Sequence, residues 1–216
     1  MSKSLYDCGD FVLLSEKEKL SGENVLNYIS LFQEETGIYD TDRMLNEVRD
    51  SKAGRLAGFD YVNRSKNGFD CRNTRGELLE VKSVNCCASD WGATFNDTNE
   101  EKAIAFTKEN VYLQVPVWID AKRMSFFLIG NNPELGEFLL NDVKNYIKSN
   151  RKRCTQTLAI TKLYSRYGFK IVSADESKED VVKRLKAKHR DTFKNLTVDE
   201  IMSVDEYKEW KEHNCQ

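Results

Sequence analysis

Two long apolar segments constrain the fold of this chain more than any other feature. They are Val111–Ile119 (VYLQVPVWI) and Met124–Ile129 (MSFFLI). Neither segment alternates between apolar and polar residues, and this pattern is typical of strands whose two faces are both covered. We therefore expect both segments to lie centrally in a sheet. Pro116 interrupts the first one, and because proline cannot donate a backbone hydrogen bond, a bulge or a sheet edge is expected there.

Helices are predicted on both sides of this pair in the sequence. Apolar residues recur at helical spacing over three segments, and Asp40 or Thr41 is placed to cap the second of them. The three segments are Glu23–Gln33, Asp42–Ala57 and Leu135–Lys148.

Shorter strands are predicted between and after the helices. The polar stretch Cys86–Asn99 has no regular pattern and is expected to be irregular. The expected strands are Phe59–Val62, Phe69–Arg72, Glu77–Val84 and short pieces within Leu158–Val172. This order predicts a mixed α/β (α+β) domain over residues 1–172, with a central mixed sheet flanked by helices. Residues 173–216 are predicted to form a charged, helical C-terminal extension.

Charge is distributed unevenly along the 216 residues, although the formal net charge is only −2. Residues 1–50 carry five basic and eleven acidic side chains, whereas residues 141–194 carry fifteen basic and six acidic ones. The basic stretch would suit a polyanion, and a solvated helix surface explains it equally well. No apolar run reaches the roughly 18 residues of a membrane span, and the six cysteines have no framework spacing. We expect a cytoplasmic protein with reduced thiols.

Three residues in one predicted hairpin stand out chemically: Asp70, Glu80 and Lys82. Glu80 and Lys82 are two positions apart in a strand and therefore share a face. The turn Asn73–Gly76 would bring Asp70 to the same end of the hairpin. Two adjacent carboxylates repel each other unless a cation lies between them, and oxygen ligands without His or Cys favour Mg²⁺. Lys82 would position or activate water, or stabilise charge on a phosphate.

The Glu-x-Lys triplet is weak evidence by itself, because it recurs at Glu100, Glu176, Glu206 and Glu209. Only Glu80–Lys82 lies in an apolar strand behind a hairpin that carries an upstream Asp. A surface strand with one cross-strand ion pair is the structural alternative for these residues.

The spacing Asp70, nine residues, then Glu80-Val81-Lys82 resembles the PD-(D/E)xK motif of restriction-endonuclease-like nucleases. It is similar in particular to PvuII-type restriction endonucleases, which share the hairpin, the gap and a Glu-Val-Lys-Ser-Val-Asn strand end. The resemblance covers roughly residues 50–172 and implies an α/β sheet core, a homodimer, Mg²⁺ and hydrolysis of DNA. It implies that Asp70 and Glu80 bind the metal and that Lys82 is the catalytic lysine. Phe69 stands where the family name has Pro, and the C-terminal residues have no counterpart.

Candidate DNA contacts follow from the polar stretch and from basic clusters. By the resemblance, the stretch after Lys82 reads bases, and Asn and Thr suit base edges in the major groove; an ordinary loop with capped turns is the alternative. The candidate base-reading residues are Thr94, Asn96, Thr98 and Asn99. The candidate phosphate contacts are Arg151, Lys152, Arg153, Lys162 and Arg166. Glu47 is a further acidic candidate, for which a surface glutamate is the simpler explanation.

We therefore expect a Mg²⁺-dependent type II restriction endonuclease that cuts a short palindromic site in double-stranded DNA. Two alternatives stay open: a phage or repair nuclease with the same core, acting on structured or nonspecific DNA, and a non-catalytic DNA-binding module. The helices Glu23–Gln33 and Asp42–Ala57 are the expected dimerisation surface.

Overall fold

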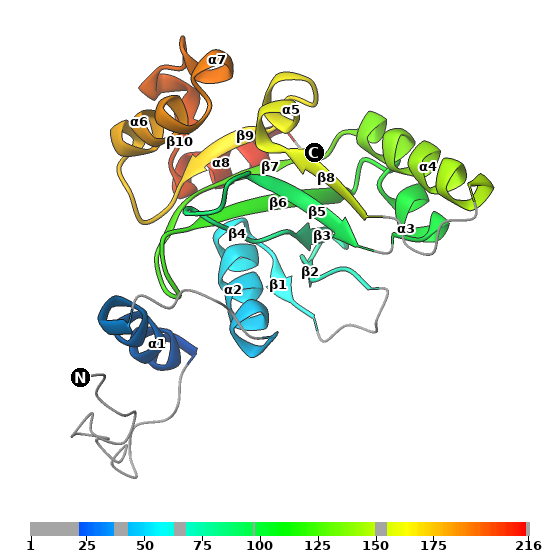
Figure 1. Ribbon diagram of the computed structural model, residues 1–216. Helices are drawn as coiled ribbons and strands as arrows, with labels where there is room; N and C mark the ends of the chain where they lie inside the picture. The colour runs from blue at the N-terminus through cyan, green and yellow to red at the C-terminus, as the bar shows by residue number, and fades with distance from the viewer. Residues whose placement is uncertain (1–21, 37–42, 63–67, 97, 150–154, 215–216) are drawn as a thin grey trace.

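The computed structural model describes residues 22–36, 43–62, 68–96, 98–149 and 155–214 (Figure 1). Its centre is an eight-stranded sheet in the order β1-β2-β3-β6-β7-β9-β10, with β4 also paired to β6. Pairing is antiparallel except at β3–β6, β4–β6 and β9–β10. The strands are β1 (Asp60–Tyr61), β2 (Cys71–Arg72), β3 (Leu78–Val81), β4 (Val84–Asn85), β6 (Val111–Trp118), β7 (Met124–Gly130), β9 (Lys170–Ser173) and β10 (Ile201–Met202).

Strands β6 and β7 form the middle of the sheet, as their apolar sequence predicts. Every residue of β6 is buried, and so is every residue of β7 except Gly130. The register between the two strands shifts between Val117 and Trp118, one residue after Pro116. A bulge therefore lies next to this proline, although β6 has partners on both sides and is not an edge strand.

Pro116 also faces a break in the neighbouring strand. The carbonyls of Gln114 and Trp118 accept hydrogen bonds from the amides of Lys82 and Cys86, at 2.9 and 2.7 Å. Because backbone groups two residues apart in a strand point the same way, Pro116 faces that side too, where it has no N–H to donate. The break between β3 and β4 falls opposite this position and includes Lys82 and Ser83.

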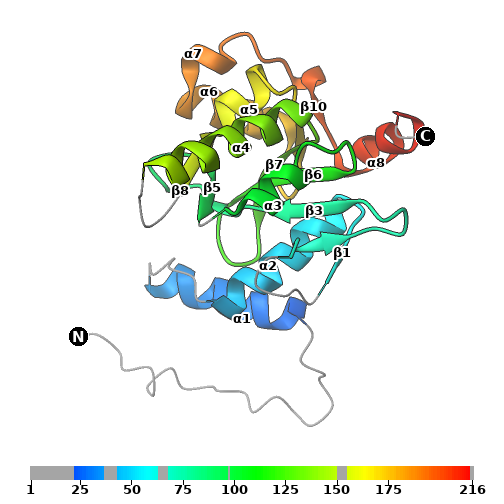
Figure 2. The same cartoon turned by 90° about the vertical axis from the view of Figure 1, so that its right-hand side faces the viewer.

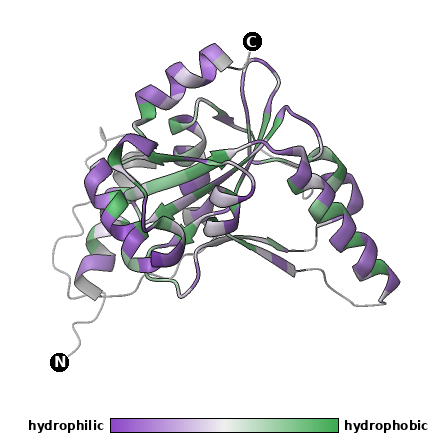
Figure 3. Ribbon diagram, turned by 90° about the horizontal axis from the view of Figure 1, so that it is seen from above, coloured by the Kyte–Doolittle hydropathy of each residue, from purple (hydrophilic) through white to green (hydrophobic). Residues whose placement is uncertain are grey.

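Helices cover both faces of the sheet, which confirms the mixed α/β class predicted from the sequence (Figure 2). Helix α2 (Arg43–Leu56) and helix α8 (Val204–Asn214) pack on the face that carries Leu79 and Val81. Figure 3 shows the largely hydrophobic central strands surrounded by helices in which hydrophilic and hydrophobic residues alternate. The other face is covered by α4 (Pro133–Lys148), α5 (Ile160–Ser165), α6 (Lys178–Lys188) and α7 (Arg190–Phe193).

The stretch predicted to be irregular contains a strand, and this expectation was wrong. Strand β5 (Gly92–Asn96) pairs antiparallel with β8 (Thr155–Ala159) to form a separate two-stranded ribbon. Within β5, Ala93 and Phe95 are buried in the core, whereas Thr94 and Asn96 are exposed. Strand β8 leads directly into α5, so Leu158–Val172 also contains a helix that the sequence interpretation lacked.

The C-terminal segment is helical, as expected, and it also contributes a strand to the sheet. Strand β10 pairs parallel with β9, through Ile201 opposite Ile171. Tyr207 of α8 is 1% exposed and packs edge-on against Phe127 of β7. Residues 173–214 therefore share the sheet and core of the preceding chain.

Helix α1 (Gly22–Thr36) lies against the connection between β6 and β7. Ser30 donates a hydrogen bond of 2.8 Å to Asp120 in that connection. Tyr28 and Leu31 are exposed on the same helix. The predicted role of α1 and α2 in dimerisation stays a prediction. Among the described residues, no helix is both long and apolar enough to cross a bilayer.

Candidate active site

The hairpin brings Asp70 and Glu80 to adjacent positions. Strands β2 and β3 are antiparallel, and Cys71 pairs with Leu79. Asp70, one residue before Cys71, therefore lies opposite Glu80, one residue after Leu79. A carboxylate oxygen (Oδ2) of Asp70 accepts the backbone N–H of Val81 at 2.8 Å. The side chain of Asp70 thus ties the end of β2 to the peptide that follows Glu80. The hairpin thus places the two acids at opposing backbone positions, and Leu79 and Val81 of β3 face the other side of the sheet from Glu80.

Glu80 is fully buried and its two carboxylate oxygens have different surroundings. Oε1 contacts the ammonium groups of Lys82 and Lys102, the second at 2.7 Å. Oε2 is buried and has no hydrogen-bond partner among the described residues. A buried carboxylate oxygen without a partner costs free energy, so its retention requires an explanation.

Lys102 is a member of this cluster that the sequence analysis did not nominate. It lies in the short helix α3 (Glu100–Ala105), which begins after its N-cap, Asn99. The Lys102 ammonium lies 5.4 Å from the ring centroid of Phe69, and the Lys82 ammonium lies 5.7 Å from that of Phe95. The spacing of Lys102 from the hairpin follows no motif, so only the fold reveals the contact.

The two acids of this site, Asp70 and Glu80, suit a divalent cation that takes only a few protein ligands. Among the described residues, no group of three or more His, Cys, Asp or Glu side chains gathers where a metal ion could be held. Mg²⁺ commonly takes only one or two carboxylates and completes its shell with water and phosphate oxygens. Glu80, whose buried Oε2 has no partner in the described part of the chain, and Asp70, at the opposing position of the hairpin, fit this smaller requirement.

A third acid, Asp50 of α2, reaches the strand break from the opposite face of the sheet. Asp50 is 8% exposed and accepts a hydrogen bond of 3.0 Å from the hydroxyl of Ser83. Glu47, nominated from the sequence, belongs to α2, but its side chain lies outside the described residues. Among the described side chains of α2, Asp50 is therefore the acid that contacts Ser83, the residue after Lys82.

The candidate base-reading residues divide into two groups. Thr94 and Asn96 lie on the exposed face of the β5–β8 ribbon, opposite Thr157 and Thr155. The hydroxyls of Thr94 and Thr157 lie 3.0 Å apart. Thr98 follows the ribbon and is half-buried. Asn99 caps α3 through a 2.8 Å hydrogen bond from the amide of Lys102.

The candidate phosphate contacts are only partly described. Arg151, Lys152 and Arg153 lie outside the described residues. Lys162 of α5 places its ammonium 4.0 Å from the ring centroid of Phe138, and Arg166 is exposed just after that helix.

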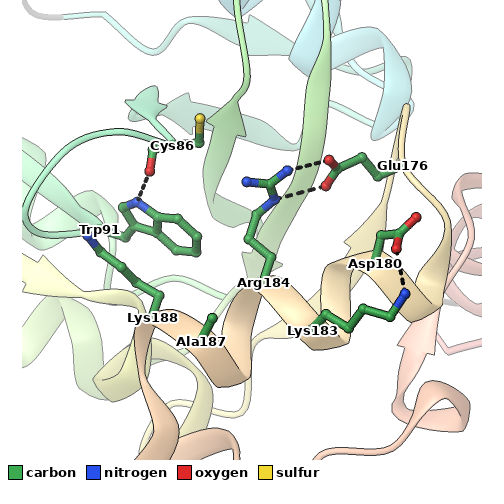
Figure 4. A pocket seen from close by; sticks show the side chains of 8 residues that line it. All are labelled: Cys86, Trp91, Glu176, Asp180, Lys183, Arg184, Ala187 and Lys188. Atoms are coloured by element: carbon green, nitrogen blue, oxygen red, sulfur yellow. Dashed lines mark hydrogen bonds and ion pairs between the residues drawn. The ribbon is translucent and has the colours of Figure 1, made fainter.

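A pocket of about 540 Å³ lies between α6 and the connection from β4 to β5 (Figure 4). None of the candidate catalytic residues lines it. Its charged side chains are paired internally: Arg184 with Glu176 at 2.9 Å, Lys183 with Asp180 at 3.0 Å, and Lys188 with the carbonyl of Ala88 at 2.8 Å.

Three cysteines are free thiols within the described residues: Cys71, Cys86 and Cys87. Cys86 lines the pocket, and its sulfur lies 3.7 Å from that of Cys87. Burial and the neighbouring Cys87 raise the pKa of Cys86 to about 11. This thiol is therefore protonated at neutral pH and is a poor nucleophile.

Comparisons with known proteins do not assign a family. No protein-family model matches the chain, and no curated protein shows significant sequence similarity to it.

Proposed function

We propose that the protein is a Mg²⁺-dependent type II restriction endonuclease, which hydrolyses phosphodiester bonds of double-stranded DNA at a short palindromic sequence. The observation that carries the proposal is the state of Glu80, a fully buried carboxylate with one oxygen bound by two lysines and the other without a partner among the described residues. Buried polar atoms are hydrogen-bonded in the great majority of cases, so an oxygen of a fully buried carboxylate that lacks a partner in the described part of the chain supports a role in binding a cation.

The proposed roles follow from the positions of the side chains. Asp70 and Glu80 would hold Mg²⁺, which when bound polarises the phosphodiester and favours ionisation of water. Lys82 would orient the attacking water and stabilise negative charge on the phosphate, because its ammonium lies beside Glu80. The break between β3 and β4 supports this role, since it leaves Lys82 outside the regular ladder while its amide stays bonded to Gln114.

Sequence specificity is proposed for the β5–β8 ribbon. A two-stranded ribbon fits the major groove, where amide and hydroxyl groups can read base edges. Thr94 and Asn96 share the exposed face with Thr155 and Thr157. A nuclease that ignores sequence has no need of such a face. A homodimer would match the two-fold symmetry of a palindromic site.

One observation favours the alternative of a non-catalytic DNA-binding module. The charge of Glu80 is already compensated by Lys82 and Lys102, as in a structural ion-pair network.

Incubation with unmethylated phage DNA and Mg²⁺, followed by sequencing of the fragment ends, tests the proposal. We expect discrete fragments with the wild-type protein and intact DNA with Lys82→Ala. A smear would support the nonspecific nuclease. Intact DNA with a wild-type protein that still retards DNA in a gel would support the binding module, and full cleavage by Lys82→Ala would refute the role of the lysine.

A further inference from the structure

We propose that Lys102 is an internal counter-ion, which neutralises Glu80 through contact with Oε1 in the metal-free protein and moves away from this carboxylate when a divalent cation binds at Oε2. This inference rests on the proposed function. It assigns to Lys102, which lies outside the motif of Asp70, Glu80 and Lys82, a role in setting the metal affinity of the site.

Charge balance is the first argument. The formal charges of Asp70 and Glu80 are balanced by those of Lys82 and Lys102, so these four residues sum to zero formal charge. Both ammonium groups contact the same oxygen of Glu80, although like charges at such short range repel. A divalent cation at this carboxylate would add two further positive charges. Binding is therefore favoured if one ammonium moves away from Glu80.

The anchoring of the two lysines indicates which one moves. Lys82 is two residues from Glu80 along the chain, directly after β3, so its backbone stays next to this carboxylate whatever conformation the side chain adopts. Lys102 reaches Glu80 from a separate element, α3, through its full side chain. The side chains of Lys82 and Lys102 are 23% and 16% exposed, so both ammonium groups lie near solvent and the difference lies in their attachment to the chain. Its ammonium can swing toward solvent without a change in the backbone, since long lysine side chains readily place their charged end in water.

Two features keep Lys102 near the site after it has left Glu80. The capping bond from the Lys102 amide to Asn99 at 2.8 Å fixes its backbone. The ring of Phe69, 5.4 Å from the ammonium, can still bind a cation at its face. The displaced ammonium would then be available to a DNA phosphate, where a lysine acts as a point charge.

Metal binding to the protein alone is the first test, measured by calorimetry with Mn²⁺ as the probe. Without the competing ammonium, Lys102→Met should bind Mn²⁺ about tenfold more tightly, the change in affinity that corresponds to about 1.4 kcal/mol. Lys102→Arg retains the charge and should stay close to wild type. Lys108→Met removes an exposed lysine just after the same helix and should change nothing.

Accessibility of the amine is the second test, and it needs no substitution. In the wild-type protein, acetylation of Lys102 should become severalfold faster when Mg²⁺ is added, whereas acetylation of Lys108 should not change. Mass spectrometry of the peptides reports both rates. This measurement holds even if Lys102→Met fails to fold.

The outcomes separate this inference from the proposed function. If wild-type protein binds Mn²⁺ and loses that binding in Glu80→Gln, but Lys102→Met binds with unchanged affinity and the acetylation of Lys102 does not respond, the counter-ion role is refuted and the metal site stands. If wild type and Lys102→Met both fail to bind Mn²⁺, the metal site of the proposed function is refuted, and the counter-ion role with it.

Discussion

Two carboxylates of this molecule, Glu80 and Glu176, are both held by basic side chains, but only one of them is saturated. Glu176 receives both arms of the Arg184 guanidinium, one at 2.9 Å, and also the hydroxyl of Ser125. Glu80 receives two lysines on a single oxygen, and its other oxygen has no partner among the described residues. The more deeply buried of the two acids is therefore the less satisfied one.

The difference between the two acids lies in the geometry of the basic side chains that bind them. An arginine fork matches both oxygens of a carboxylate at once, which fixes the pair and leaves little capacity for a ligand. Lysines are point charges that can share one oxygen and leave the other available. Burial acts to raise the pKa of Glu176, but the hydrogen bonds from Arg184 and Ser125 outweigh it and lower that pKa below its ordinary range. We infer that Glu176 serves stability and that Glu80 serves binding.

The largest predicted effect is on DNA cleavage. Glu80→Gln should lower the cleavage rate by about a thousandfold, because it removes a ligand of a cation that contributes several kcal/mol to the transition state. Glu176→Gln, the matched substitution in the saturated pair, should stay within about twofold of wild type, a change of under 0.5 kcal/mol in the barrier. Single-turnover cleavage of a plasmid measures both rates. Equal losses in the two variants would remove the distinction between the acids.

The next effect is on the free energy of unfolding, and here Glu176→Gln should cause the larger loss and Glu80→Gln the smaller one. Glu176→Gln should lower the free energy of unfolding by about 2 kcal/mol, since hydrogen bonds to charged groups contribute roughly 1.5–3 kcal/mol. Glu80→Gln should change it by less than about 1 kcal/mol, because the cost of burying the carboxylate is removed and the two part-exposed ammonium groups can turn toward water. Urea unfolding followed by circular dichroism gives both values. A larger loss in Glu80→Gln would instead identify its lysines as a structural network.

The sequence predicted those features that depend on residues close together along the chain. Asp70, Glu80 and Lys82 belong to one hairpin, and alternation along the strand places Leu79 and Val81 on the opposite face. The central strands followed from their apolar runs, because burial on both faces leaves a clear pattern.

Contacts between distant segments could not be predicted in this way. Lys102 reaches Glu80 from a separate helix, and Glu176 meets Arg184 and Ser125 only after β7 and α6 have packed together. Strand β5 was missed because its exposed Thr94 and Asn96 resemble loop residues, while Ala93 is small and gives a weak apolar signal. Its partner β8 lies about 60 residues later, so no hairpin signal joins them.

A smaller effect concerns the pH dependence of stability. The pKa of Glu176 in the folded protein lies below its ordinary value of 4.5, so the charged form stabilises the fold. The stability difference between wild type and Glu176→Gln should be complete above that ordinary value and shrink as the pH falls through the folded pKa. Urea unfolding of both proteins from pH 7 down to pH 3 checks the sign. A difference that grows toward acid pH would contradict the pairing.

The smallest effect should appear at Cys86, which lines the same pocket as Glu176. Burial and Cys87 dominate its raised pKa, while the charge of Arg184 lowers it and that of Glu176 raises it. Glu176→Gln leaves the guanidinium uncompensated, so the thiolate becomes slightly easier to form. Alkylation of Cys86 at pH 8 should therefore be faster by no more than about threefold, as expected for a change of less than half a pKa unit. Peptide mass spectrometry in a Cys87→Ser background measures the rate. A slower reaction would show that the loosened Arg184 reorganises the pocket rather than acting through its charge.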